Sequence, residues 1–185
     1  MVSARCQQKI RCPLPRGSGR PARTDWVPVV KSRHRGEDTS MRGEERRQLV
    51  RDFLARHKLG AISTVHPDGS PEAAVIQVTL GDDLNIVFDS FPGSRKLENI
   101  KRDSRIAMVI GWDENVTVQI EGLARPAKAN ELQRLRDAHV ANCPLEAEFL
   151  KQGAQLFTIS PQWIRYSDFR GEPIVFELSG DSLAK

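Results

Sequence analysis

The feature that most restricts the fold of this 185-residue chain is a series of short segments in which every second residue is apolar. Residues 104–112 carry Ile106, Met108 and Ile110 at this spacing, and residues 116–125 repeat the alternation. A period of two is typical of strands that bury one face and expose the other. The pattern therefore predicts a sheet with one buried side.

Turn residues separate these segments, as in Pro67-Asp68-Gly69, and helical periodicity appears between some of them. We predict strands at residues 60–65, 71–80, 84–90, 104–112, 116–125, 155–160 with a continuation past Pro161, and 173–178. We predict helices at residues 44–58, 94–102, 130–140 and 145–151. Six or seven strands joined mostly by short turns predict a mainly β protein, an antiparallel barrel or sandwich with helical insertions.

Residues 1–40 differ from the rest in composition. They hold four prolines, nine Lys or Arg and three Asp or Glu, a net charge of +6, so the other 145 residues carry −2 of the total of +4. No periodicity is sustained there, which predicts a disordered basic extension followed by one domain at residues 41–185. The extension is either a flexible arm or the product of an upstream start codon before Met41.

The same charge distribution disfavours nucleic acid as a partner, because a nucleic-acid-binding fold needs a basic face on the domain itself. No apolar run reaches membrane-spanning length, and residues 1–20 lack the apolar core of a secretory signal. Three cysteines, Cys6, Cys12 and Cys143, match neither a disulfide framework nor a zinc pattern. We therefore expect a cytoplasmic protein without a membrane partner.

Residues 88–96, Phe-Asp-Ser-Phe-Pro-Gly-Ser-Arg-Lys, lead from a predicted strand into a predicted helix. Ser94 is a suitable N-cap, and Arg95 and Lys96 fall in the first turn, where the helix dipole disfavours cations. Two cations, a hydroxyl and free N–H groups there would form a phosphate site. The alternative is two solvated basic residues on a surface helix.

The chain shows no Ser-His-Asp set, no metal-ligand cluster and no phosphate-binding glycine motif. His57, His66 and His139 have no ligand spacing, so we expect them to be solvated and expect no metal site. The absence of catalytic motifs is typical of a protein whose reactive centre is a bound cofactor.

The order of elements and several motifs resemble the pyridoxamine 5'-phosphate oxidase-like FMN-binding split barrels. The resemblance covers roughly residues 47–169 and rests on four motifs: Ala-Ile-Ser-Thr-Val at 61–65, Pro-Glu-Ala-Ala at 71–74, Gly-Ser-Arg-Lys-Leu-Glu-Asn-Ile at 93–100 and Asp-Ser-Arg-Ile-Ala-Met-Val-Ile at 103–110. It implies a six-stranded antiparallel split barrel that forms a homodimer, with FMN at the subunit interface and a small-molecule substrate.

The resemblance also implies a set of cofactor-binding residues. Those that match the grip on the flavin phosphate are Ser94, Arg95 and Lys96, with Asp89 and Ser90 at the phosphate or ribityl chain. The strand residues that would follow the flavin ring, largely through their backbone, include Ile76, Gln77 and Val78. The remaining matches are Thr117 and Gln119, as polar contacts, and Trp163 and Arg165, contributed by the partner subunit.

For Gln77 and Gln119 the sequence allows two interpretations. Each side chain lies either on a solvated sheet face or against a flavin. Pyridoxamine phosphate oxidases carry Arg and Lys where this chain has Ala74 and Thr79, and the region from Trp163 to Phe169 lacks the histidine of their C-terminal motif. We therefore expect a different substrate, which the sequence does not identify.

We expect a flavin-dependent oxidoreductase that uses FMN, with no catalytic residue assigned. A deazaflavin coenzyme or haem is the alternative cofactor, because some members of the superfamily bind these instead. The alternative function is a non-catalytic, stress-related protein that binds flavin, deazaflavin or haem.

Overall fold

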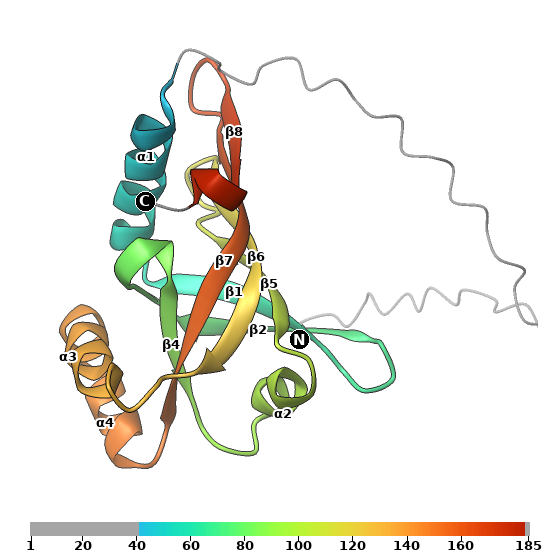
Figure 1. Cartoon of the computed structure of the whole chain (residues 1–185), viewed down its shortest axis with the longest axis vertical. Helices are drawn as coiled ribbons and strands as arrows, with labels where there is room; N and C mark the ends of the chain where they lie inside the picture. The colour runs from blue at the N-terminus through green and yellow to red at the C-terminus, as the bar shows by residue number, and fades with distance from the viewer. Residues whose placement is uncertain (1–40, 184–185) are drawn as a thin grey trace, which may run out of the picture. The chain divides into compact units, whose positions relative to one another are not determined.

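Eight β-strands and four α-helices make up the part of the chain that the computed structural model describes, residues 41–183 (Figure 1). The predicted extension at residues 1–40 lies outside the described residues. The helices are α1 (Gly43–Arg56), α2 (Arg95–Arg102), α3 (Leu132–Asn142) and α4 (Glu146–Lys151). The strands are β1 (Leu59–Val65), β2 (Pro71–Gln77), β3 (Thr79–Leu80), β4 (Ile86–Ser90), β5 (Arg105–Ile110), β6 (Val116–Pro126), β7 (Gln155–Asp168) and β8 (Ile174–Ser179).

All pairings between neighbouring strands are antiparallel, in the order β2-β1-β5-β6-β7-β4-β3, and β8 pairs with β7 beside this path. The two ends of the sheet, β2 and β3, are joined in sequence through the single residue Val78. A sheet whose two edges meet in the chain must curl round on itself, which gives a barrel that is split at this edge. The predicted fold class, a mainly β barrel with helices, is confirmed.

The strand count differs slightly from the expected six or seven. The predicted strand at residues 71–80 is divided at Val78. Its N–H donates to the Lys58 carbonyl (2.9 Å), one step beyond the Leu59–Gln77 pair, but its own carbonyl accepts from the Asn142 side chain (3.0 Å). Conversely, β7 runs unbroken through Pro161. Pro161 lies at a bulge, where the β6–β7 register shifts between Glu121 and Gly122, and such sites tolerate a residue without an N–H group.

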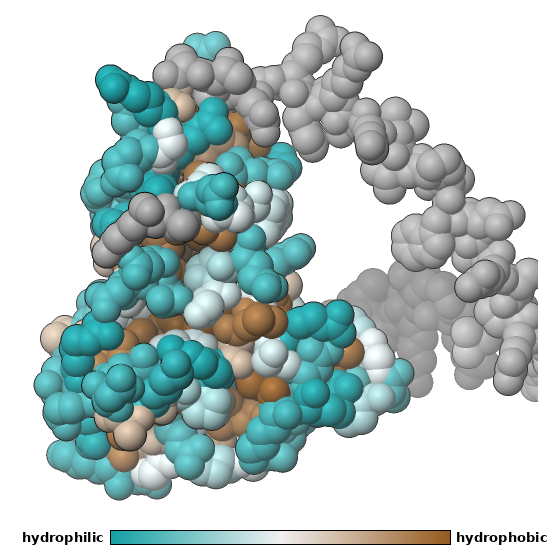
Figure 2. Space-filling view, viewed as in Figure 1, coloured by the Kyte–Doolittle hydropathy of each residue, from teal (hydrophilic) through white to brown (hydrophobic). Residues whose placement is uncertain are grey.

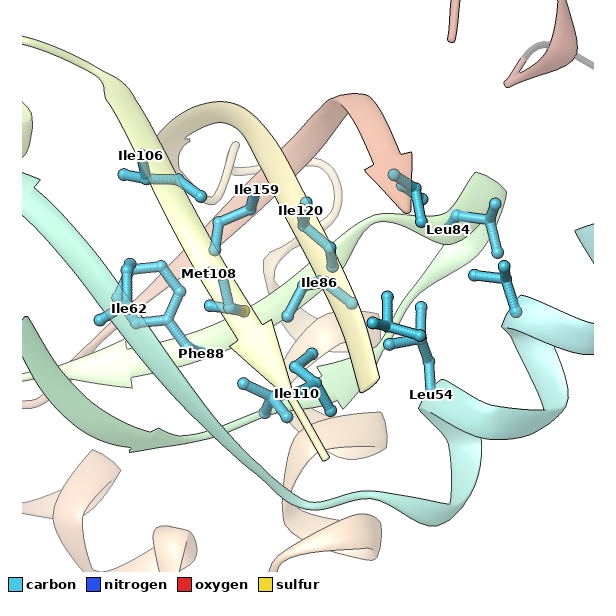
Figure 3. Close-up of a cluster of buried hydrophobic side chains, with 14 of the residues drawn as sticks. Leu54, Ile62, Leu84, Ile86, Phe88, Ile106, Met108, Ile110, Ile120 and Ile159 are labelled. Atoms are coloured by element: carbon cyan, nitrogen blue, oxygen red, sulfur yellow. The ribbon is translucent and has the colours of Figure 1, made fainter. Parts of the chain in front are cut away.

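The barrel interior is filled by the apolar residues that the alternation predicts. Ile62, Ile86, Met108, Ile110 and Ile120 are all buried and converge from four strands (Figure 3). Helix α1 contributes Val50, Phe53 and Leu54 to the same cluster. Around this core, α2 packs on β1 and β2, while α3 packs on β3, β4 and β7.

Among the described residues, no helix has both the length and the apolar character needed to cross a membrane.

The bulge between β6 and β7 depends on Gly122, because a Cβ at this position would lie 2.5 Å from the Ser160 carbonyl oxygen. This neighbour is backbone and cannot rotate away. We expect Gly122→Ala to lower the free energy of unfolding by about 2–3 kcal/mol, measured by chemical denaturation.

Gly171→Ala is the matched control, since a Cβ at Gly171 meets nothing within 4 Å. Its stability should stay within about 0.5 kcal/mol of the wild type. A Gly122→Ala protein as stable as the control would contradict the close approach of β6 and β7.

Candidate functional site

The segment that joins β4 to α2 forms the turn that the sequence predicts. Gly93 adopts a positive φ of 80°, and the Ser94 N–H donates to the Phe91 carbonyl at 3.2 Å. Leu97 and Ile100 are buried and fix the helix against the barrel. The first turn of a helix carries N–H groups without intrahelical partners, so α2 directs a partial positive charge toward the end of β4.

Ser94 occupies the N-cap position, but its side chain makes no capping hydrogen bond. Its hydroxyl instead lies 3.0 Å from the hydroxyl of Ser90, the last residue of β4. The pair places two hydroxyl groups beside the first turn of α2, where Arg95 and Lys96 begin.

A cavity of about 220 Å³ opens at this helix end, between α2 and strands β1 and β2. The residues that line it are Ile62, Thr64, Glu72, Ala73, Ala74, Arg95 and Lys96. The structure therefore places the two predicted cations on one cavity. A volume of this size suits a phosphate group but is below the roughly 300–1,000 Å³ typical of a whole-ligand pocket.

Glu72 holds the Arg95 guanidinium in the described structure, because the two side chains form an ion pair. The Arg95 side chain is 80% exposed, whereas that of Glu72 is only 14% exposed. The other Glu72 oxygen accepts a hydrogen bond from Asn99 Nδ2 (2.9 Å), and the same amide nitrogen donates to Thr64 Oγ1 (3.0 Å). A carboxylate that the sequence did not single out therefore occupies one wall of the cavity.

Lys96 is half-buried at the opposite wall. Burial lowers the pKa of its ammonium, and the negative charge of Asp89 opposes that shift. A partly desolvated cation gains more from an anion than a fully solvated one, since less water must be removed when the anion binds. The cavity thus combines two cations, one carboxylate and a helix N-terminus.

The strand residues predicted to follow a flavin ring lie on β2 and at its end. Ile76 and Val78 direct their side chains into the core, and Asn142 Nδ2 donates to the Val78 carbonyl (3.0 Å). The Gln77 side chain accepts from the Cys143 thiol (3.5 Å). Because β2 is an edge of the sheet, backbone groups along its outer side are left without a neighbouring strand.

A second set of predicted residues lies on the outer face of the sheet. One cross-strand row runs through Val75, Ala61, Val109, Gln119 and Arg165, with one residue from each of β2, β1, β5, β6 and β7. Arg165 and Trp163 both contact Glu177 of β8, at 3.2 and 3.0 Å. Thr117 lies on the same side of β6, where it is half-buried. None of Thr117, Gln119, Trp163 and Arg165 lines the α2 cavity.

The row beside it consists of Ala73, Ser63, Ala107, Glu121 and Trp163. Its small side chains leave a groove of about 440 Å³ that Ser63, Ala107 and Glu121 help to line. Together the two rows divide this face of the sheet. The side chains on β1, β2 and β5 are small and mostly apolar, whereas β7 and β8 carry charged side chains.

Asp89 and Ser90 are adjacent in β4 and therefore point to opposite sides of the strand. Ser90 faces Ser94, whereas Asp89 faces α3 and α4, where His139 Nε2 lies 3.5 Å from Asp89 Oδ1. In Figure 1, α2 and the α3–α4 pair lie on opposite sides of β4. The structure thus separates the Asp89 side chain from Ser94.

His139 is wholly buried, so the prediction that it is solvated is wrong. The buried positions of α3 are Leu135 and His139, four residues apart, whereas Leu132 is exposed. The spacing of four from Leu135 is the sequence signal that could have placed His139 on the buried side. Thr79 Oγ1 lies 2.8 Å from His139 Nδ1, so the Thr79 side chain contacts His139 in the interior of the fold.

Glu146 of α4 lies beside the same two residues. Burial, followed by the negative charge of Asp89 and a hydrogen bond with it, raises the pKa of Glu146 to about 7. Asp89, His139 and Glu146 form a buried polar cluster that the sequence did not predict.

Comparison with known proteins is consistent with this architecture. A family model described as pyridoxamine 5'-phosphate oxidase matches residues 47–168, while no curated protein matches the chain. A heme binding protein from Mycobacterium smegmatis is similar in structure, with a TM-score of 0.64 and 19% identity over 73% of this chain and 58% of that one. This chain therefore spans little more than half of the mycobacterial protein.

Two further solved structures share the fold over nearly their whole length. The general stress protein 26 of Bacillus anthracis has a TM-score of 0.53 and 18% identity, over 71% of this chain and 97% of that one. A Clostridium acetobutylicum protein related to general stress protein 26 has a TM-score of 0.56 and 14% identity, over 77% and 99%. The family model covers about two thirds of the sequence, and the chain belongs to the pyridoxamine 5'-phosphate oxidase-like family.

Proposed function

We propose that this protein is a flavoprotein that binds FMN with its phosphate in the α2 cavity and acts as an oxidoreductase on a small molecule. The observation that carries the proposal is the convergence of Arg95, Lys96 and the Ser90–Ser94 hydroxyl pair at a helix N-terminus. Cations, hydroxyl donors and free N–H groups are the complement of a phosphate dianion.

The donor set of the cavity favours a flavin over haem. The cations, hydroxyl groups and free N–H groups at this helix end complement a phosphate, a group that haem lacks. A flavin nucleotide or a deazaflavin coenzyme, each of which carries phosphate, needs only the groups that the cavity supplies. The spectrum and mass of the cofactor extracted from native protein distinguish these two.

In this assignment the chain binds and orients, and the cofactor would supply the hydride chemistry. Arg95 and Lys96 would neutralise the phosphate, while the free edge of β2 would supply backbone groups near Ile76 and Gln77 for the ring. The N–H and carbonyl of Val78 already bond to Lys58 and Asn142. Thr79, at the position of a lysine in pyridoxamine phosphate oxidases, is buried against His139 and Asn142. That burial supports a substrate other than pyridoxamine phosphate.

A second copy of the chain completes the site in this proposal. The cavity of about 220 Å³ holds the phosphate end only, so the ring must lie outside it. The outer sheet face exposes Val75 (64%), Val65, Val109 and Leu123, and apolar residues also reach the surface across the middle of the view in Figure 2. Clustered apolar residues on one face mark an interaction surface. A partner subunit packed there would bring its own Trp163 and Arg165 to the site.

The double substitution Arg95→Ala and Lys96→Ala removes both cations from the cavity. We expect FMN affinity to fall by about 100-fold, because each charge-assisted contact contributes about 1.5–3 kcal/mol. Flavin absorbance after purification and titration with FMN give the measurement.

The control is Lys101→Ala, which removes a cation from the other end of α2 and should leave flavin content unchanged. If the double variant keeps its flavin, the site assignment is wrong.

Reduction by a nicotinamide cofactor followed by reoxidation with substrate turnover supports an enzyme, whereas bound flavin without turnover supports the non-catalytic alternative.

Glu72→Gln tests the carboxylate that competes with phosphate for Arg95. The amide can still accept from Asn99 but carries no charge, so we expect FMN to bind about two- to five-fold more tightly. Riboflavin, which lacks the phosphate, is the control ligand and should show no gain. Equal effects on both ligands would place the phosphate away from Arg95.

Val75→Glu places a charge at the most exposed valine of the outer sheet face. We expect the wild type to be a dimer and the variant to be a monomer with reduced flavin content, measured by light scattering and absorbance. Leu145→Glu, on an even more exposed apolar residue (78%) at the start of α4, should remain dimeric. A monomeric wild type would contradict the shared site.

A further inference from the structure

Three side chains from different elements meet in the interior between the barrel and its helical insertion. They are Asp89 of β4, His139 of α3 and Glu146 of α4, and one possible ligand atom from each lies within 4.8 Å of the others. The His139 and Asp89 side chains are 0% and 9% exposed, and Glu146 is buried as well. Buried charged groups of this kind require a compensating partner.

One ring nitrogen of His139 has such a partner and the other does not. Nδ1 contacts Thr79 Oγ1 at 2.8 Å, and that oxygen also accepts from Asn142 Nδ2 at 3.0 Å. Nε2 is buried and makes no hydrogen bond within residues 41–183, although Asp89 Oδ1 lies 3.5 Å away. Because a buried polar atom without a partner is costly, Nε2 marks a place for a ligand.

The contacts of Thr79 orient the ring for this purpose. The Thr79 hydroxyl also lies against the Cys143 thiol. With its own proton directed to that sulfur, the Thr79 oxygen accepts from both Asn142 and His139 Nδ1. The lone pair of Nε2 then points toward the two carboxylates. Histidines that bind metals have this arrangement, in which the second nitrogen donates to a fixed acceptor.

The carboxylates of Asp89 and Glu146 contribute like charges in a space with little water. The cation whose charge reaches Asp89 is Lys96, which is half-buried at the wall of the α2 cavity. Asp89 and Glu146 share a hydrogen bond, so a proton lies between the two carboxyl groups beside the imidazole lone pair, where a metal ion can take its place. A cation bound between them satisfies all three groups at once.

We infer that Asp89, His139 and Glu146 form a binding site for one divalent first-row transition-metal ion, with Zn²⁺ as the best match. Imidazole and carboxylate are ordinary zinc ligands, and a tetrahedral ion with bonds of about 2.0–2.2 Å places its ligand atoms about 3.4 Å apart. The separation of 3.5 Å between His139 Nε2 and Asp89 Oδ1 fits this arrangement. The fourth position is left for water.

The site is separate from the proposed flavin site and does not depend on it. Asp89 and Ser90 point to opposite sides of β4, so the ion lies across the strand from the phosphate cavity. It would link β4 to α3 and α4, the helices inserted between β6 and β7. Its role is to hold this insertion on the barrel.

The test uses the full chain, purified, treated with EDTA and dialysed against Zn²⁺. We expect one Zn²⁺ per chain beyond the background, and this ion should be lost in His139→Gln and Glu146→Gln. At about 100 times the dissociation constant, Zn²⁺ should raise the wild-type Tm by about 5–10 °C and leave the Tm of Glu146→Gln unchanged. Mg²⁺, which prefers oxygen ligands and keeps its water, should have little effect.

His66→Gln is the matched control, because His66 also lies close to a carboxylate, 2.9 Å from Asp68, but is exposed. It should keep the ion. Glu146→Gln keeps a hydrogen-bond donor toward Asp89 and removes a buried ionisable group, so it should be no less stable than the wild type in EDTA, and its loss of Zn²⁺ cannot then reflect unfolding. Equal stoichiometry in the wild type and Glu146→Gln would overturn the assignment, as would a wild type that gains no stability from Zn²⁺.

Discussion

The pairing of β6 with β7 is the constraint on which the rest of the structure depends. These are the longest strands among the described residues, with 11 and 14 residues, and β7 also carries β4 and β8. The register of this pair sets Gln119 beside Arg165, and the β4–β7 pairing sets the level at which Asp89 and Ser90 emerge. Gly122, at the bulge, allows the backbones of β6 and β7 to approach closely. The functional groups discussed above are positioned on the sheet that this strand pair organises.

Strand β4 then separates two kinds of chemistry. Its last residue, Ser90, pairs with Ser94 at the helix end where Arg95 and Lys96 line a cavity, while Asp89 belongs to a buried cluster rich in carboxyl groups. The cavity would attract an anion and the cluster would attract a cation. Strand β4 alone separates the two, since successive side chains of a strand point to opposite sides. Lys96 lines the cavity and still senses the charge of Asp89, which opposes the lowering of its pKa by burial.

Much of the barrel was predictable from the sequence, because period-two alternation reports directly on a sheet with one buried face. Residues 105–110 and 116–126 show this most clearly, as does the turn that ends at Ser94. Details that depend on partners distant in sequence were not predictable. The carbonyl of Val78 accepts from Asn142 where β2 ends, and β7 passes Pro161 where the opposite strand supplies a glycine. The burial of His139 could have been predicted from its spacing of four from Leu135, but its polar partners could not, since Thr79 and Asp89 lie 60 and 50 residues away in the chain.

The ion pair between Glu72 and Arg95 affects which anions the cavity accepts. Without a ligand, the guanidinium already has a counter-charge, so the cavity is not a bare positive centre. Inorganic phosphate would have to displace Glu72 and would gain only the contacts of the cavity itself. A phosphate that carries a large organic group gains additional contacts along β2 and can offset the loss of the pair. In the proposed site, Glu72 would thereby discriminate against the small anions that are abundant around any protein.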